Sequence, residues 1–315
     1  MKSGKALELL VSSILLNVGF SKVRSDGRYV FDGSAGQMVQ GLGEAHNADV
    51  LVEPSVQTPF YTPSRLLVEC KDYSKSIGLN TLRSVLGLRE DINHFDIVDE
   101  QELQARQRNR RAGIAHDHRR HYYQVAVAST TGFTVAAQNF ALTHRIPLIE
   151  INKMPFWNDF CAASGVGIRF SVAGTTRPDK KCDLKLTNEI MKIAKRSAVA
   201  ITNDGQLLFL YSEDENGIDF DDSFSLHWRS TNDPWILRSG GRDYYFQLPK
   251  QIREYWLKNS HSDLERKVNA ISFKTTLLSN MVVYYSDEYG HPKLKMISID
   301  HYELEDALRK LKNEE

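Results

Sequence analysis

The chain has 315 residues, enough for two domains, and 40 basic and 40 acidic residues give it a formal net charge of zero. Its content of 41% hydrophobic and 25% charged residues is ordinary for a soluble globular protein. Because the charges balance, any surface that binds nucleic acid must be local. Three cysteines without a Cys-x-x-Cys motif argue against a disulfide framework and a zinc knuckle, which fits a reducing cytoplasm.

Residues 3–18 predict an amphipathic helix, because apolar residues recur there at helical spacing from Leu7 to Val18. Glu8 falls on the border of that apolar face. It is either a solvated carboxylate favoured by the helix dipole, or a side chain directed along a sheet toward a site. The apolar stretch is too short and too polar to cross a bilayer, so we expect a cytoplasmic protein with no membrane contact.

The next segments contain one turn signal and one histidine of interest. Residues 20–32 predict a strand or hairpin that turns at Asp26 and Gly27. Residues 33–47 are rich in Gly, Gln and His and predict a loop. His46, at its end, could contact a metal or phosphate, although a loop histidine is more often structural.

Two short strands are predicted to place three charged side chains together. The apolar run 66–68, bounded by Pro, Ser, Asp and Tyr, predicts a buried strand that ends with Glu69 and Lys71 on one face. A second strand, 48–52, begins beside Asp49. If the two strands are neighbours, the two carboxylates form an oxygen site suited to Mg²⁺. The Lys can then position or help to deprotonate an attacking water, or stabilise the charge that develops on the phosphate.

A second Glu-x-Lys in the chain serves as a comparison. Glu265 and Lys267 have polar neighbours at helical spacing, so we interpret them as a solvated helical surface. The pair at 69 and 71 differs because an apolar strand leads into it. Burying either charge alone is costly, so this pair needs a partner, a metal or a ligand.

Residues 79–95 predict a helix, and an arginine-rich stretch follows at 96–121. It has few large apolar residues and cannot form its own core. A charged surface helix is one interpretation, but so many arginines on a neutral protein favour contact with phosphates. The residues predicted to bind nucleic acid are Arg106, Arg108, Arg110, Arg111, Arg119 and Arg120.

Residues 123–151 predict a strand, a helix and a second strand, which implies parallel pairing through a right-handed crossover. Beyond residue 155 the pattern predicts an α+β arrangement, with hairpins at 198–211 and 281–299. Further helices are expected at 187–196, 249–258 and 302–312. Five aromatic residues there could stack on bases but are more often core: Trp228, Trp235, Tyr244, Tyr245 and Trp256.

Over about residues 1–155 the chain resembles the PD-(D/E)xK nuclease superfamily, in particular its Mrr-like restriction endonucleases. Four features match in order: a helix with Glu8, a strand at Asp49, the tripeptide 69–71, and the strand–helix–strand unit at 124–151. Ala48 stands where the superfamily has its name-giving Pro. The resemblance implies an α/β restriction-endonuclease-like domain, a mixed sheet flanked by helices.

The same resemblance implies an Mg²⁺-dependent endonuclease that hydrolyses DNA phosphodiester bonds, in restriction or anti-phage defence. Asp49, Glu69, Lys71 and Glu8 would be the catalytic residues. Asp49, Glu69 and the backbone carbonyl of Cys70 would hold Mg²⁺, with Mn²⁺ as a substitute. We expect double-stranded DNA as the partner, with RNA left open, and a homodimer is one assembly to consider.

We therefore expect a nuclease domain at 1–155 and an α+β domain at 156–315 for targeting, assembly or ligand sensing. Two alternatives remain. The protein could be a non-catalytic nucleic-acid-binding or assembly subunit with a nuclease fold, or a nuclease regulated by a ligand. The intact Asp, Glu and Lys favour an active enzyme over the first alternative.

Overall fold

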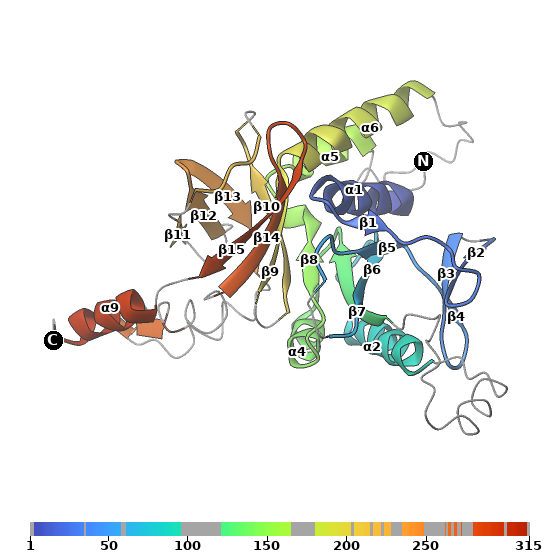
Figure 1. The fold of residues 1–315 in the computed structure, drawn as a ribbon, viewed down its shortest axis with the longest axis horizontal. Helices are drawn as coiled ribbons and strands as arrows, with labels where there is room; N and C mark the ends of the chain where they lie inside the picture. Colours follow the sequence, from blue (N-terminus) through green and yellow to red (C-terminus); the bar gives the residue numbers. More distant parts are fainter. Residues whose placement is uncertain are drawn as a thin grey trace, which may run out of the picture.

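The protein is described by a computed structural model with two large sheets and one small sheet (Figure 1). The described residues are 3–34, 36–57, 61–95, 121–164, 180–202, 205–214, 217–221, 224–227, 235–248, 262, 264–265, 268–269, 272, 280–298 and 301–313. In this part of the chain, no helix is both long and apolar enough to span a bilayer.

The N-terminal half contains a mixed five-stranded sheet, as predicted. Its strands, in spatial order, are β1 (Ser21–Lys22), β5 (Val50–Glu53), β6 (Ser64–Lys71), β7 (Tyr122–Ser129) and β8 (Leu148–Glu150). The first three strands pair antiparallel, whereas β6, β7 and β8 pair in parallel. The parallel pairing of β7 with β8 confirms the predicted strand–helix–strand unit.

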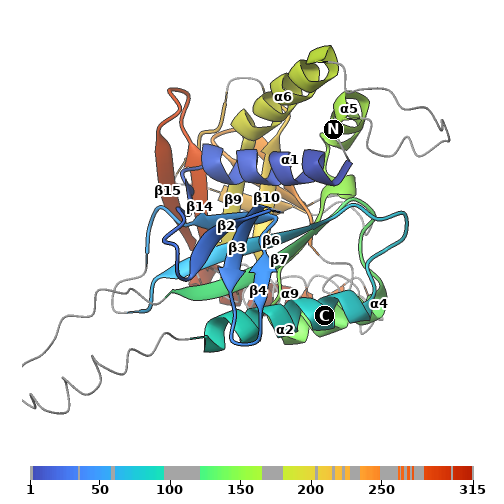
Figure 2. The same ribbon diagram turned by 90° about the vertical axis from the view of Figure 1, so that its right-hand side faces the viewer.

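Helices cover both faces of this sheet (Figure 2). The amphipathic helix α1 (Ser3–Asn17) lies on one face, while α2 (Leu79–His94) and α4 (Val135–Thr143) lie on the other. Side chains alternate along each strand, so Val68 of β6 packs with the α1 core and Leu67 with the α2 core. The last two odd-numbered positions of β6 are Glu69 and Lys71, which therefore leave the sheet on the side of α2.

A small antiparallel sheet replaces two of the predicted segments. It comprises β2 (Val30–Gly33), β3 (Gly36–Gln40) and β4 (Ala45–Asn47). Of the strand or hairpin expected at 20–32, the turn at Asp26 and Gly27 is present, but the hairpin is wrong because β1 pairs with β5 and β2 pairs with β3. The expected loop at 33–47 is also wrong, since Val39 of β3 is fully buried and β3 pairs on both sides.

The C-terminal half, for which an α+β arrangement is expected, is built on a curled, half-barrel antiparallel sheet. Its spatial order is β11 (Phe224–His227), β12 (Trp235–Ser239), β13 (Arg242–Phe246), β10 (Leu207–Ser212), β9 (Ser197–Thr202), β14 (Asn280–Ser286) and β15 (Pro292–Ser298). The remaining elements are η1 (Ile151–Lys153), α5 (Trp157–Ser164), α6 (Lys180–Lys195) and α9 (His301–Asn313).

Both predicted hairpins of this half are confirmed by the antiparallel pairs β9–β10 and β14–β15. Trp235 and Tyr244 are buried in its core, as favoured from the sequence. Trp228, Trp256 and the expected helix at 249–258 lie outside the described residues.

One hydrophobic cluster spans the two halves. It joins apolar residues of α1, β5 and β6 to residues of α6, β9 and β10, so α1 packs on the N-terminal sheet and also against α6. At the end of α1, the side-chain amide of Asn17 donates a hydrogen bond of 2.9 Å to the carbonyl of Ala194. The expected boundary at residue 155 therefore divides a shared core, and the division of the chain into two domains there stays a prediction.

Candidate active site

The antiparallel register of β5 and β6 brings Asp49 beside Glu69. Val50 pairs with Val68, so the next opposed positions are Asp49, just before β5, and Glu69, near the end of β6. The Oδ2 atom of Asp49 accepts a hydrogen bond of 2.8 Å from the backbone N–H of Cys70. The predicted adjacency of these two strands is confirmed, and it depends on the register of their pairing.

Lys71 completes this cluster. Its Nζ atom donates a hydrogen bond to Oε2 of Glu69 and lies 3.8 Å from Oδ2 of Asp49. Two carboxylates therefore share one ammonium group, so the cluster retains one uncompensated negative charge. The structure thus brings together the three side chains that the sequence singled out.

Burial and charge shift the pKa values of this cluster. Glu69 is 8% exposed, and burial raises the pKa of its carboxyl, an effect that the charge and hydrogen bond of Lys71 only partly offset. Burial alone would lower the pKa of Lys71, but the charge and hydrogen bond of Glu69, with Asp49, raise it above its ordinary value. Lys71 is therefore an ammonium group at neutral pH.

The side chain of Cys70 points to the other face of β6, into the α1 core. Burial, together with the negative charges of Asp49 and Glu8, raises the pKa of its thiol well above the ordinary value. The thiol is thus uncharged and unsuited to act as a nucleophile or a thiolate ligand. A role for Cys70 in binding would have to come from its backbone.

Glu8 lies near this cluster without joining it. Its Oε2 atom accepts a hydrogen bond of 2.6 Å from Nζ of Lys5, one turn earlier on α1. Glu8 and Asp49 line the same cavity, of about 270 Å³. No set of three or more His, Cys, Asp or Glu side chains within the described ranges is arranged to hold a metal ion by itself.

His46 is tied to a partner that the sequence did not suggest. Its Nε2 atom lies 2.7 Å from Oδ2 of Asp91 on α2. The other carboxylate oxygen of Asp91 accepts a hydrogen bond of 2.8 Å from the backbone N–H of Gly43. A Cβ atom at Gly41 would lie 2.1 Å from Oδ2 of Asp91, so this turn requires glycine there.

The His46–Asp91 pair therefore holds β4 against α2, and β4 leads directly to Asp49. The structural interpretation of His46 accounts for its contacts. The spacing of Gly41 and Gly43 was the available signal for a close approach of another side chain. The glycines do not identify that side chain, which is Asp91, 45 residues after His46 in the chain.

A second unpredicted contact lies just beyond Lys71. The hydroxyl of Thr130, in the loop after β7, donates a hydrogen bond of 2.7 Å to Oδ1 of Asp72. The backbone N–H of Thr130 donates one of 3.3 Å to the carbonyl of Lys71. The loop after β7 thus fixes the backbone at the end of β6.

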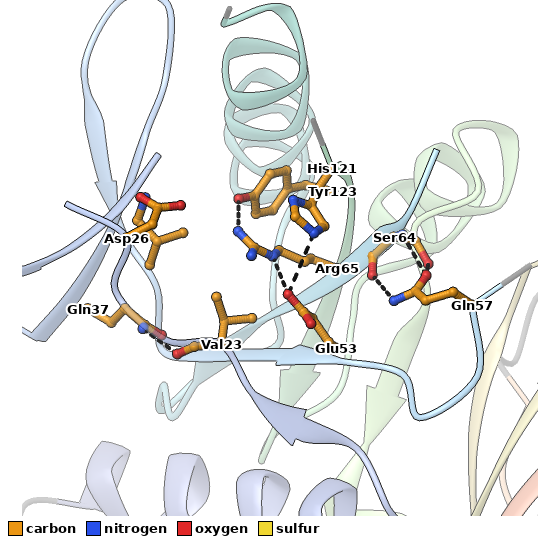
Figure 3. Close-up of polar contacts among 10 residues, drawn as sticks. Val23, Asp26, Gln37, Glu53, Gln57, Ser64, Arg65, His121 and Tyr123 are labelled. Atoms are coloured by element: carbon orange, nitrogen blue, oxygen red, sulfur yellow. Dashed lines mark hydrogen bonds and ion pairs between the residues drawn. The ribbon is translucent and has the colours of Figure 1, made fainter. Parts of the chain in front are cut away.

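The start of β6 carries a different charged cluster (Figure 3). The Nε atom of Arg65 donates a hydrogen bond of 2.7 Å to Oε1 of Glu53, and its Nη1 atom donates one of 2.9 Å to the hydroxyl of Tyr123. His121 lies 3.7 Å from the same oxygen of Glu53. Arg65 is 7% exposed, so this cluster is a buried structural network at the opposite end of the strand.

The remaining site predictions are outside this geometry. The six arginines at 106–120 lie outside the described residues. In the comparison pair, Glu265 is exposed and exchanges hydrogen bonds with Ser262, from the Ser N–H to the Glu carboxylate and from the Glu N–H to the Ser hydroxyl. This is a capping box on a polar surface, as expected for a solvated helix; Lys267 is not among the described residues.

Comparisons with known proteins place the chain in no family. No protein-family model matches it, and no curated protein matches it. Among solved structures, one described as "Crystal Structure of Protein of Unknown Function AF1548" is similar at 15% sequence identity, with a TM-score of 0.33. That similarity covers 60% of this chain and 79% of the other.

Proposed function

We propose that the protein is a metal-dependent endonuclease of the PD-(D/E)xK type, which hydrolyses phosphodiester bonds in DNA. The observation that carries this proposal is the convergence of Asp49 and Glu69 on one ammonium group, that of Lys71. The order of these residues on two paired strands, with α1 on one face of the sheet and α2 on the other, supports it further.

The donor set fits Mg²⁺. Asp49 and Glu69 supply carboxylate oxygens, and their uncompensated negative charge favours a cation. Mg²⁺ is usually held in proteins by one or two carboxylates, with waters and substrate phosphates as the other ligands, so a set of three acidic side chains is not needed. Asp49, Glu69 and the carbonyl of Cys70 would hold the ion, which would supply Lewis-acid stabilisation and an activated water.

Lys71 would stabilise charge on the phosphate. Its raised pKa keeps it an ammonium group, which can donate hydrogen bonds to the phosphate oxygens as negative charge develops there. The contact from Thr130 to the carbonyl of Lys71 would hold the end of β6 in position during the reaction. Glu8 would have to leave Lys5 before it could support a metal-bound water.

The direct test is nicking of supercoiled plasmid DNA with and without Mg²⁺. We expect nicking with Mg²⁺ or Mn²⁺ and none in EDTA. Cleavage that persists in EDTA would contradict the metal requirement. DNA binding without cleavage under all metal conditions would instead favour a non-catalytic binding or assembly subunit.

A further inference from the structure

The cavity beside Asp49 is built from four separate segments of the N-terminal half. Three lining residues come from α1, and the others come from β1, from the start of β3 and from the entry to β5. Its volume is about 270 Å³. The charged and polar side chains that line it are Lys5, Glu8, Ser12, Lys22, Gln37 and Asp49.

Two lysines line the cavity, and they differ in their partners. Lys5 is bound to Glu8 at 2.6 Å, so its charge is compensated. Lys22 is exposed, and its ammonium group has no hydrogen bond or ion pair with any residue that the structure describes. The two lining carboxylates are already assigned, because Glu8 is paired with Lys5 and Asp49 belongs to the cluster of Lys71. With a cation bound at Asp49 and Glu69, as proposed above, Lys22 is the lining charge left without a partner in the described part of the chain, and it favours an anion.

The uncharged lining adds one hydrogen-bond donor and open space. The hydroxyl of Ser12 has no partner among the described residues, so it can donate to an anion. The amide of Gln37 is already used, since its Nε2 atom donates a hydrogen bond of 2.8 Å to the carbonyl of Val23 (Figure 3). Gly36 has a φ of +135°, which favours glycine, so no side chain occupies the rim of the cavity at this position.

The volume limits the size of the ligand. Pockets for drug-sized molecules span roughly 300 to 1,000 Å³, so this cavity fits one small unit rather than a base pair. Asp49 lines the cavity and also belongs to the proposed catalytic cluster. An anion bound at Lys22 would thus lie next to the phosphodiester that the cluster would attack.

We infer that this cavity binds one sugar–phosphate unit of the nucleic-acid strand, adjacent to the cleaved bond, with Lys22 and Ser12 contacting the phosphate. This inference rests on the proposed nuclease function and names the part of the substrate that the neighbouring cavity takes. Contacts of this kind go to the backbone, so they position the strand without reading its sequence.

The test measures binding apart from cleavage. The affinity of the full chain for a fluorescent double-stranded oligonucleotide is followed by anisotropy in CaCl₂, at a series of salt concentrations. Lys22→Ala should weaken binding about 3- to 10-fold at low salt and reduce the slope of log K against log salt by about 0.9, the value for one lost phosphate contact. Lys22→Arg should restore both values.

Two further variants separate this site from general effects. Lys310→Ala removes a positive charge from an exposed position on α9, which lies far from α1 in Figure 1, and should leave both values unchanged. Ser12→Phe should fill the cavity and weaken binding while keeping Lys22. A nucleoside monophosphate at millimolar concentration should not displace the oligonucleotide.

Each result bears on the inference separately from the nuclease proposal. If Lys22→Ala binds with wild-type affinity and salt dependence, the cavity assignment is overturned, even if the wild type nicks plasmid. If binding depends on Lys22 but the wild type never nicks plasmid with Mg²⁺, the contact of Lys22 with the strand stands, and the nuclease proposal falls together with the position of this contact beside a cleaved bond. Displacement by the nucleoside monophosphate would overturn the assignment to a strand.

Discussion

The two ends of β6 both carry charged clusters, but their charges are balanced differently. At the start of the strand, Arg65 has a carboxylate partner in Glu53 and a hydroxyl partner in Tyr123, and its guanidinium lies 5.8 Å from the centre of the Tyr123 ring. At the end, one ammonium group serves two carboxylates, and one of them is 3.8 Å away. A balanced cluster needs nothing further, whereas the unbalanced one favours an added cation.

The balance of charge, rather than burial, separates structural from functional side chains on this strand. Both clusters are largely buried, so burial alone does not distinguish them. Their pairing does, together with the cavity that borders Asp49. Variants at the end of β6 should therefore lose cleavage and keep their stability, whereas variants at its start should lose stability and keep cleavage.

The largest effect is expected at the unbalanced end. Asp49→Ala, Glu69→Ala and Lys71→Ala should each lower the cleavage rate about 10³-fold or more, because they act on the transition state. The fold and most of the DNA affinity should remain, as circular dichroism and anisotropy would show. Glu265→Ala is the matched control and should cleave normally. A fully active Lys71→Ala protein would defeat the assignment.

At the balanced end, the effect should fall on stability. Arg65→Ala removes a buried guanidinium together with its hydrogen bonds to Glu53 and Tyr123, and should lower the free energy of unfolding by about 1–3 kcal/mol, measured by urea denaturation. Cleavage per folded molecule should stay near the wild-type rate. Replacing both partners, with Arg65→Met and Glu53→Leu, should recover most of the loss. If Arg65→Ala instead lowers cleavage in a fully stable protein, the two ends are not separated as we describe.

A smaller effect is expected at Asp91, which anchors β4 through His46. The hydrogen bond from His46, followed by that from the N–H of Gly43, lowers the pKa of Asp91 below its ordinary value of 3.8. The carboxylate therefore stabilises the fold above pH 3.8, and this contribution is lost as the pH falls through the lower pKa of the folded state.

Asp91→Asn should thus be less stable than the wild type at neutral pH, by about 1–2 kcal/mol, and the difference should shrink in acid. Denaturation curves at several pH values would measure it. A difference that does not change with pH would show that the charge of Asp91 is not what holds β4.

The smallest effect is expected at Cys70. Cys70→Ala should cleave within a few-fold of the wild type, because the proposed role belongs to the backbone carbonyl and the thiol faces the α1 core. Since burial raises the pKa of the thiol, native protein should also resist alkylation of Cys70 at neutral pH. Mass spectrometry of the labelled protein would check this. Rapid labelling of Cys70 would contradict the buried, uncharged thiol.

The sequence was sufficient to predict the central cluster because its signals are local. An apolar run followed by Glu69 and Lys71 at alternate positions predicts a strand end with two charges on one face. The strand at Asp49 was predicted in the same way, and its pairing with β6 brings Asp49 beside Glu69. The hairpins of the C-terminal half carried equally local turn signals, such as the glycines at 205 and 290.

The features that were missed depend on residues far apart in the chain. The sequence carries no signal for the role of Arg65, because its partners lie 12 and 58 residues away. The sheet of β2, β3 and β4 was missed because its strands are short and rich in glycine, and it gains stability from packing against α2. No periodicity within residues 30–47 predicts packing against a helix that follows later in the chain.

The position of α1 has a consequence for how the protein is made. This helix leaves the ribosome before α6, β9 and β10, which cover part of its apolar surface. Those partners are synthesised up to about 190 residues later, which at 5–20 residues per second is roughly 10–40 s. During that interval the nascent chain exposes a surface that its own N-terminal sheet does not cover. Chaperone binding to α1 during translation is therefore expected to be transient and to end once the strands of the second sheet emerge.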